Sequence, residues 1–160
     1  MARMKVEGLA DFSTMLQSLQ GEGVPICKRA IYDGAAVLIE EVKRQIQEIP
    51  EQKGFMHGSN KRRYIAPWEK KDLLSHAGIA HINEKSGNVS TSIGFDGISK
   101  YKSKAHPSGI PVPILAYAVI RGGPNREYYD FLRRAFKAAA PRVQQVMQAT
   151  AEAEIKKLNE

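Results

Sequence analysis

The chain has 160 residues, of which 42% are hydrophobic and 26% charged, a composition typical of one folded globular domain and not of a disordered segment. Its one cysteine, Cys27, excludes an internal disulfide framework and is expected to be a small buried thiol rather than a nucleophile. No run of about 18 apolar residues is present, so we expect neither a membrane span nor an N-terminal secretory signal.

The net charge of +7 is concentrated in three stretches. Residues 50–72 contain six Lys or Arg against three Asp or Glu, and residues 97–113 contain three lysines and no acid. Arg121 and Arg126 flank a glycine turn. Such a surplus in predicted loops indicates a polyanionic or acidic partner. Lysines that only keep the protein soluble would explain it equally well.

The first fifty residues predict a short strand and two helices. Residues 3–7 alternate as a strand does, and residues 9–19 have apolar side chains at helical spacing. Residues 26–49 form the dominant pattern, a long amphipathic helix whose apolar face carries Ile31, Ala35, Leu38, Val42, Ile46 and Ile49. Pro25 suits its first turn, Pro50 ends it, and Gly34 is expected to mark the close approach of another element.

Residues 51–68 show no apolar period and are predicted to be a long basic loop. The loop keeps several large apolar side chains, so we expect it to pack against something, such as a neighbouring chain. Pro67 is expected to open a short helical turn that runs to Leu74. The candidate contact residues of this loop are Lys53, Lys61, Arg62, Arg63, Tyr64 and Trp68.

Residues 75–96 change to a period of two and predict a β-hairpin with its turn at residues 83–88. A second long loop is predicted over residues 97–113, where several prolines and glycines interrupt any pattern. The candidate contact residues in and after this loop are Lys100, Tyr101, Lys102, Lys104 and Arg121.

The C-terminal third predicts one ambiguous segment and one long helix. Residues 114–120 are continuously apolar, which allows either a buried strand or a short buried helix. A helical stripe then runs from Tyr128 to Leu158, and Pro141 within it is expected to cause a kink or a break. Its predicted apolar face comprises Tyr128, Leu132, Ala135, Phe136, Ala139, Val143, Val146 and Thr150.

The sequence contains no pattern that predicts catalysis or a cofactor. His76 and His81 would point to opposite faces of a strand, and His57 and His106 have no second ligand at a suitable spacing. No phosphate-binding loop, dinucleotide fingerprint or nucleophile elbow is present. We therefore expect neither an enzyme nor a metal or cofactor site.

Nucleic-acid binding is the stronger chemical reading, because both predicted loops interleave cations with aromatic residues. Lysines and arginines would contact phosphates, and Tyr64 or Tyr101 would stack on bases, which gives binding without sequence preference. No known DNA- or RNA-reading motif accompanies these residues. A free-standing basic nucleic-acid-binding protein is therefore the alternative interpretation of the chain.

Several short strings occur along the chain in the order found in one family: Met4-Lys5-Val6-Glu7-Gly8-Leu9, the helix of residues 30–49 with Pro50, Leu73-Leu74-Ser75, Ile93-Gly94-Phe95-Asp96, the apolar segment of residues 113–120, and Phe131-Leu132-Arg133-Arg134-Ala135-Phe136. In this order they resemble the small neck or tail-completion proteins of long-tailed bacteriophages. Departures from the family pattern are the basic stretch after Pro50, Ile120-Arg121-Gly122-Gly123 in place of Glu-x-Gly-Thr, and Asp130-Phe131 in place of Pro-Phe.

The resemblance implies an α+β domain, with the long helix and the C-terminal helix packed on a small antiparallel sheet. It implies a virion protein, made in the bacterial host cytoplasm, that forms a ring at the head–tail junction. Its partners would be other copies of itself, connector or adaptor proteins on one side, and the tail tube or tail terminator on the other. DNA would pass through the centre. We also predict that residues 52–68 and 97–113 rearrange or become ordered on assembly.

Overall fold

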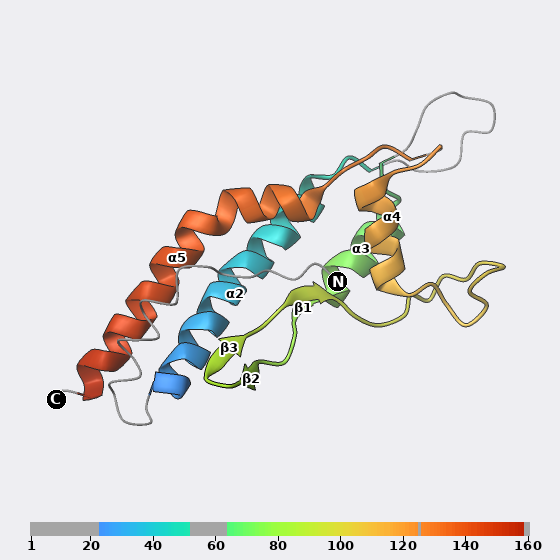
Figure 1. Ribbon diagram of the computed structural model, residues 1–160. Helices are drawn as coiled ribbons and strands as arrows, with labels where there is room; N and C mark the ends of the chain where they lie inside the picture. The colour runs from blue at the N-terminus through green and yellow to red at the C-terminus, as the bar shows by residue number, and fades with distance from the viewer. Residues whose placement is uncertain (1–22, 52–63, 125, 159–160) are drawn as a thin grey trace. The chain divides into compact units, whose positions relative to one another are not determined.

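The computed structural model describes residues 23–51, 64–124 and 126–158 (Figure 1). These residues form the helices α2 (Gly23–Glu48), α3 (Pro67–His76), α4 (Val112–Arg121) and α5 (Phe131–Leu158). They also form the short strands β1 (Ala77–Ile79), β2 (Asn83–Lys85), β3 (Asn88–Ser90) and β4 (Ile93–Phe95). The predicted α+β class is confirmed. The strand expected at residues 3–7 and the helix at 9–19 lie outside the described residues.

The residues group into two compact units. In their described parts, the loop unit comprises residues 40–51, 64–78, 94–124 and 126–138, and the hairpin unit comprises residues 23–39, 79–93 and 139–158. The division falls within α2, β1, β4 and α5, so no linker separates the units. The expectation of a single domain stays a prediction.

Helix α2 confirms the dominant sequence pattern. All six residues of its predicted apolar face are buried, and Pro25 lies in the first turn, where its missing N–H is not needed. The helix ends at Glu48, two residues before Pro50. Burial of large aliphatic side chains such as these stabilises a fold by roughly 1.5–3 kcal/mol each.

The core of the hairpin unit lies where α2 packs against α5. Its buried residues are Ile26, Ala30, Ile31, Leu38, Ala139, Val143, Met147 and Ala151, with Val89 and Ile93 of the strands packed against them. Gly34 lies so close to Met147 that a Cβ atom built on it would be 2.6 Å from the Met147 Cγ atom. This confirms that Gly34 marks a close approach, and the partner is a helix. Thr150 strengthens the pair by donating to the Asp33 carboxylate over 2.7 Å.

The buried face of α5 differs from the predicted stripe. The buried positions recur every four residues: Phe131, Ala135, Ala139, Val143, Met147 and Ala151. Phe136 is exposed because it follows a buried residue directly and is therefore turned away by about 100°. Tyr128 is exposed as well, and it precedes the helix. Asp130 caps the helix instead, since its Oδ1 atom accepts the Arg133 backbone N–H over 2.9 Å.

Of the kink or break expected at Pro141, the break is wrong, because α5 continues through this residue. Proline removes one backbone bond to the Lys137 carbonyl. Both residues are exposed, so water can satisfy that carbonyl. The buried Ala139 and Val143 on either side keep the helix in place.

The predicted hairpin is confirmed, but its turn is tighter than expected. Strands β2 and β3 pair antiparallel with Asn83 opposite Ser90, and only Ser86 and Gly87 connect them. Both connecting residues have positive φ angles, 52° and 78°, as a type I′ turn requires. Strand β1 pairs with β4 in a second two-stranded sheet. The first predicted strand residues, Ser75 and His76, belong instead to α3.

In the loop unit, α3 packs against α4 (Figure 1). The apolar segment at residues 114–120, which could be strand or helix by its pattern, is helical. The residues at its two ends explain why it is a helix, because Pro113 lies in the first turn and Gly122 ends the helix with a φ of 69°. Buried side chains in this unit come from α2, α3, α4 and α5, and include Val42, Ile46, Ile49, Leu73, Leu115, Val119 and Phe131.

We predict that Gly34→Ala lowers the free energy of unfolding by roughly 1–3 kcal/mol, because the added methyl group overpacks the contact with Met147. The same change should cost less in a Met147→Ala background, where only the 3.3 Å approach to Val143 Cγ1 opposes the better helix propensity of alanine. Urea unfolding of the four proteins in this cycle measures both effects. An equal effect of Gly34→Ala in both backgrounds would contradict the close approach.

Candidate functional site

The candidate site is the basic loop, defined here as residues 97–111 between β4 and α4 of the loop unit (Figure 1). The loop was predicted to extend to residue 113, but α4 already begins at Val112. Backbone hydrogen bonds join the two sides of the loop. The Ser99 N–H donates to the Ile110 C=O over 2.8 Å, and the Ile110 N–H donates to the Tyr101 C=O over 2.9 Å. The predicted irregular loop is thus a folded, hairpin-like arm.

The tip of the basic loop is also hydrogen-bonded. Ser103 and His106 exchange two backbone hydrogen bonds of 3.2 and 3.1 Å around Lys104. Lys100, Lys102 and Lys104 are all exposed. The arm therefore carries its cations into solvent from a folded backbone, as a surface for an acidic or polyanionic partner would require.

Two side chains of α3 hold the base of the arm. The Ser99 hydroxyl donates to the Asp72 carboxylate and accepts the Tyr101 backbone N–H over 3.0 Å. Ser99 is only 3% exposed, so this bonded pair is shielded from water. The ring of Trp68 stacks on Tyr101 at a centroid distance of 4.1 Å, which leaves Tyr101 half exposed. Both aromatic residues were predicted contact residues, and the structure brings them together.

Two glycines permit close approaches, one between the loop and α3 and one between the two sides of the loop. Gly97 has a φ of 82°, and a Cβ atom at this position would lie 2.5 Å from the His76 Cδ2 atom. Gly109 has a φ of 125°, and a Cβ atom there would lie 2.3 Å from the Ser99 carbonyl oxygen. A side chain at either position would strain the backbone; at Gly97 it would push the loop away from α3, and at Gly109 it would push the two sides of the loop apart.

Helix α3 also binds the turn that follows α4. The Arg126 guanidinium donates to the Glu69 carboxylate over 2.5 and 3.2 Å and to the Tyr64 carbonyl over 3.2 Å. Glu69 is 2% exposed and also accepts the Ala66 N–H at the start of α3. Arg126 is therefore an internal ion-pair partner, although the charge pattern grouped it with the surface surplus. No sequence spacing links these two residues.

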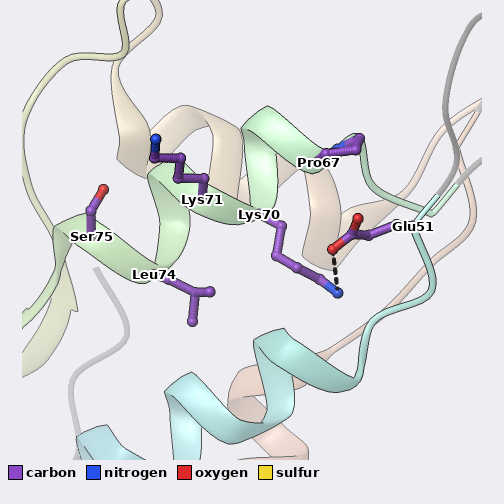
Figure 2. Close-up of a pocket in the computed structure, with 6 residues that line it drawn as sticks. All are labelled: Glu51, Pro67, Lys70, Lys71, Leu74 and Ser75. Atoms are coloured by element: carbon purple, nitrogen blue, oxygen red, sulfur yellow. Dashed lines mark ion pairs between the residues drawn. The ribbon is translucent and has the colours of Figure 1, made fainter.

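A further α3 side chain reaches the end of α2. The Lys70 ammonium donates to the Gln47 carbonyl over 2.9 Å and pairs with Glu51 at 3.0 Å (Figure 2). A cation at this position suits the unpaired carbonyls at the C-terminal end of a helix. The pair borders a shallow open pocket lined by Glu51, Pro67, Lys70, Lys71, Leu74 and Ser75, to which the basic loop contributes no residue.

The remaining predicted contact residues fall into two groups. Arg121 is exposed at the end of α4, and Tyr64 is half-buried with its ring edge-on to Tyr129 at 6.2 Å. The other four, Lys53, Lys61, Arg62 and Arg63, lie outside the described residues, as does most of the first predicted basic loop.

The described residues also bear on metal, membrane and thiol chemistry. They contain no group of three or more His, Cys, Asp or Glu side chains that could hold a metal ion. No helix in the described ranges combines the length and apolar character needed to cross a membrane. Burial raises the pKa of the half-buried Cys27 thiol, which lowers its thiolate fraction at neutral pH.

Comparison with known proteins adds no identification. No family model matches the chain, and no curated protein or solved structure is significantly similar to it. The likeness to bacteriophage neck proteins therefore rests on the short strings of the sequence alone.

We predict that Glu69→Gln lowers the free energy of unfolding by roughly 3–5 kcal/mol, because it leaves the largely buried Arg126 without its counter-charge. The amide oxygen can still accept the Ala66 N–H, so the hydrogen bond at the start of α3 is kept. Glu51→Gln is the matched control, since its pair with Lys70 is more exposed and should cost at most about 1 kcal/mol. Equal losses for both variants in urea unfolding would contradict a structural role for the Glu69 pair.

Proposed function

We propose that this protein is a structural component of the neck of a long-tailed bacteriophage. It assembles as a ring at the head–tail junction and joins the connector to the tail, with DNA passing through its centre. The observation that carries the proposal is the basic loop, a folded arm whose three lysines are exposed and whose base is bonded to α3.

A preformed arm suits an assembly part. Because the backbone of the arm is already hydrogen-bonded, a partner that grips it meets a smaller cost in conformational entropy than it would with a free loop. The exposed lysines can then form ion pairs with acidic neighbours and guide their approach. The rearrangement on assembly that the sequence suggested is accordingly proposed for the tip, around Lys104, rather than for the base.

The charge pattern supports a protein partner with acidic surfaces. No Asp or Glu occurs between Asp96 and Glu127, whereas this stretch contains three lysines and two arginines. The partners proposed from the resemblance are the connector or adaptor proteins, the tail tube or tail terminator, and further copies of this chain. The protein would accordingly reside in the virion neck after synthesis in the host cytoplasm.

A second candidate function, non-specific nucleic-acid binding, is favoured by the surroundings of Tyr101. One face of its ring stacks on Trp68, the ring is half exposed, and Lys100 and Lys102 flank it in the sequence. An aromatic platform between cations is the arrangement used to stack a base while its phosphates are neutralised.

A triple charge reversal of Lys100, Lys102 and Lys104 to Glu tests the neck function. In a phage strain that lacks this protein, we expect the wild-type chain to restore tailed virions and the triple variant to leave heads and tails unjoined in electron micrographs. The matched control reverses three exposed cations elsewhere, Lys85, Arg142 and Lys156, and should restore assembly. Tailed virions in normal numbers with the loop variant would contradict the proposal.

A gel-shift titration over salt separates the second candidate. If the isolated chain bound DNA tightly, with an affinity that fell steeply by a slope of about −0.9 per neutralised phosphate, nucleic-acid binding would be favoured over neck assembly. Weak binding, together with attachment of the chain to heads that carry a connector, is the result expected for the neck protein.

A further inference from the structure

Helix α4 is apolar on every side. From Val112 to Ile120 it contains no charged residue, and its only charge is Arg121 at the C-terminal end. A helix of this kind is normally enclosed by protein, because a solvent-facing helix carries polar residues on its outer face. In the structure α4 lies at the surface of the loop unit, so its composition does not match its exposure.

Only one face of α4 is buried by the loop unit. Val112, Leu115, Ala116 and Val119 are each at most 4% exposed and form its inner face. Ile114 and Tyr117 remain 46% and 57% exposed, although both are large and apolar. With Arg121 they follow the spacing i, i+3, i+7 and therefore share the outer face.

The two polar side chains of this outer face, Tyr117 and Arg121, already contact each other in the free protein. Arg121 donates through Nη1 to the Tyr117 hydroxyl over 2.5 Å, and its guanidinium carbon lies 5.7 Å from the centre of the Tyr117 ring. None of the ion pairs in the part of the chain that the structure describes includes Arg121. Tyrosine and arginine are the residues that most often dominate the free energy of a protein–protein contact.

We infer that the outer face of α4, formed by Ile114, Tyr117 and Arg121, is a docking surface for a different protein whose own surface has an apolar hollow rimmed by carboxylates. The inference rests on the proposed function, in which that protein is the neighbouring component of the neck. Tyr117 and Ile114 fill the hollow, and Arg121 binds a carboxylate at its rim.

Charge complementarity selects this occupant over a two-fold contact between two copies of this face. The stretch from Gly97 to Arg126 contains five cations and no acid, and α4 lies within it. A two-fold contact of the face with itself would bring like charges together, with no carboxylate from the same stretch to compensate them. An acidic surface of another protein meets both the apolar centre and the cationic surroundings.

The test measures binding of the purified chain to heads and to tails isolated from a phage strain that lacks it. The double variant Ile114→Ser, Tyr117→Ser should raise the half-saturating concentration by at least about tenfold on one of the two particles. Arg121→Glu should weaken binding to the same particle. Tyr32→Ser is the matched control, because Tyr32 is similarly exposed at 54% but lies on α2, and it should bind as the wild type does.

The outcomes separate the docking surface from the proposed function. Wild-type binding to neither heads nor tails would overturn the neck function and the inference with it. Unchanged binding of the double variant to both particles, with the triple lysine variant of the basic loop defective, would overturn the inference alone. Sedimentation of the isolated chain completes the test: a wild-type oligomer that the double variant converts to monomers would show a second copy on this face and overturn the inference. Thermal unfolding controls for loss of fold, and since both side chains are about half exposed we expect only a small shift of the midpoint.

Discussion

The loop unit depends on α3, a ten-residue helix whose polar and aromatic side chains each fix a different segment. Glu69 holds the turn after α4 through Arg126, Lys70 holds the end of α2, and Asp72 with Trp68 holds the basic loop. Loss of the ion pair between Glu69 and Arg126 should destabilise the fold most, because the Glu69 carboxylate is almost fully buried and needs a counter-charge. Irregular segments have few backbone contacts of their own, so these side-chain anchors determine where they lie.

This arrangement divides the cations of the chain into two groups with different roles. Lys70 and Arg126 are largely buried and stabilise the fold through internal pairs. Lys100, Lys102, Lys104 and Arg121 are exposed, and they lie in a stretch that contains no acid. The first group is internal to the fold, and the second group is the one that we propose for contacts with partners. The net charge does not distinguish these groups, because a cation is internal only when it pairs with a residue far away in the chain.

Elements with a strong local signal could be predicted from the sequence, whereas contacts between distant segments could not. The apolar period predicted α2 almost to its ends, and the turn residues predicted a hairpin turn within residues 83–88, where Ser86 and Gly87 form it. The apolar run at α4 was ambiguous because a continuous run has no period. The predicted stripe of α5 departs from the buried face because apolar residues also lie beside that face, as the exposed Phe136 and Tyr128 do. The sequence places Arg126 on the surface because no local pattern indicates its ion pair with Glu69, which is 57 residues away.

The central claim is that α3 holds the basic loop in a preformed conformation, and amide hydrogen exchange of the free protein tests it most directly. The account predicts that the backbone amides of Ser99 and Ile110 are protected in the wild type. In an Asp72→Ala variant they should exchange at least about tenfold faster, while amides in the middle of α5 keep their protection. Exchange of these two loop amides at the rate of an unstructured peptide in the wild type would contradict the claim.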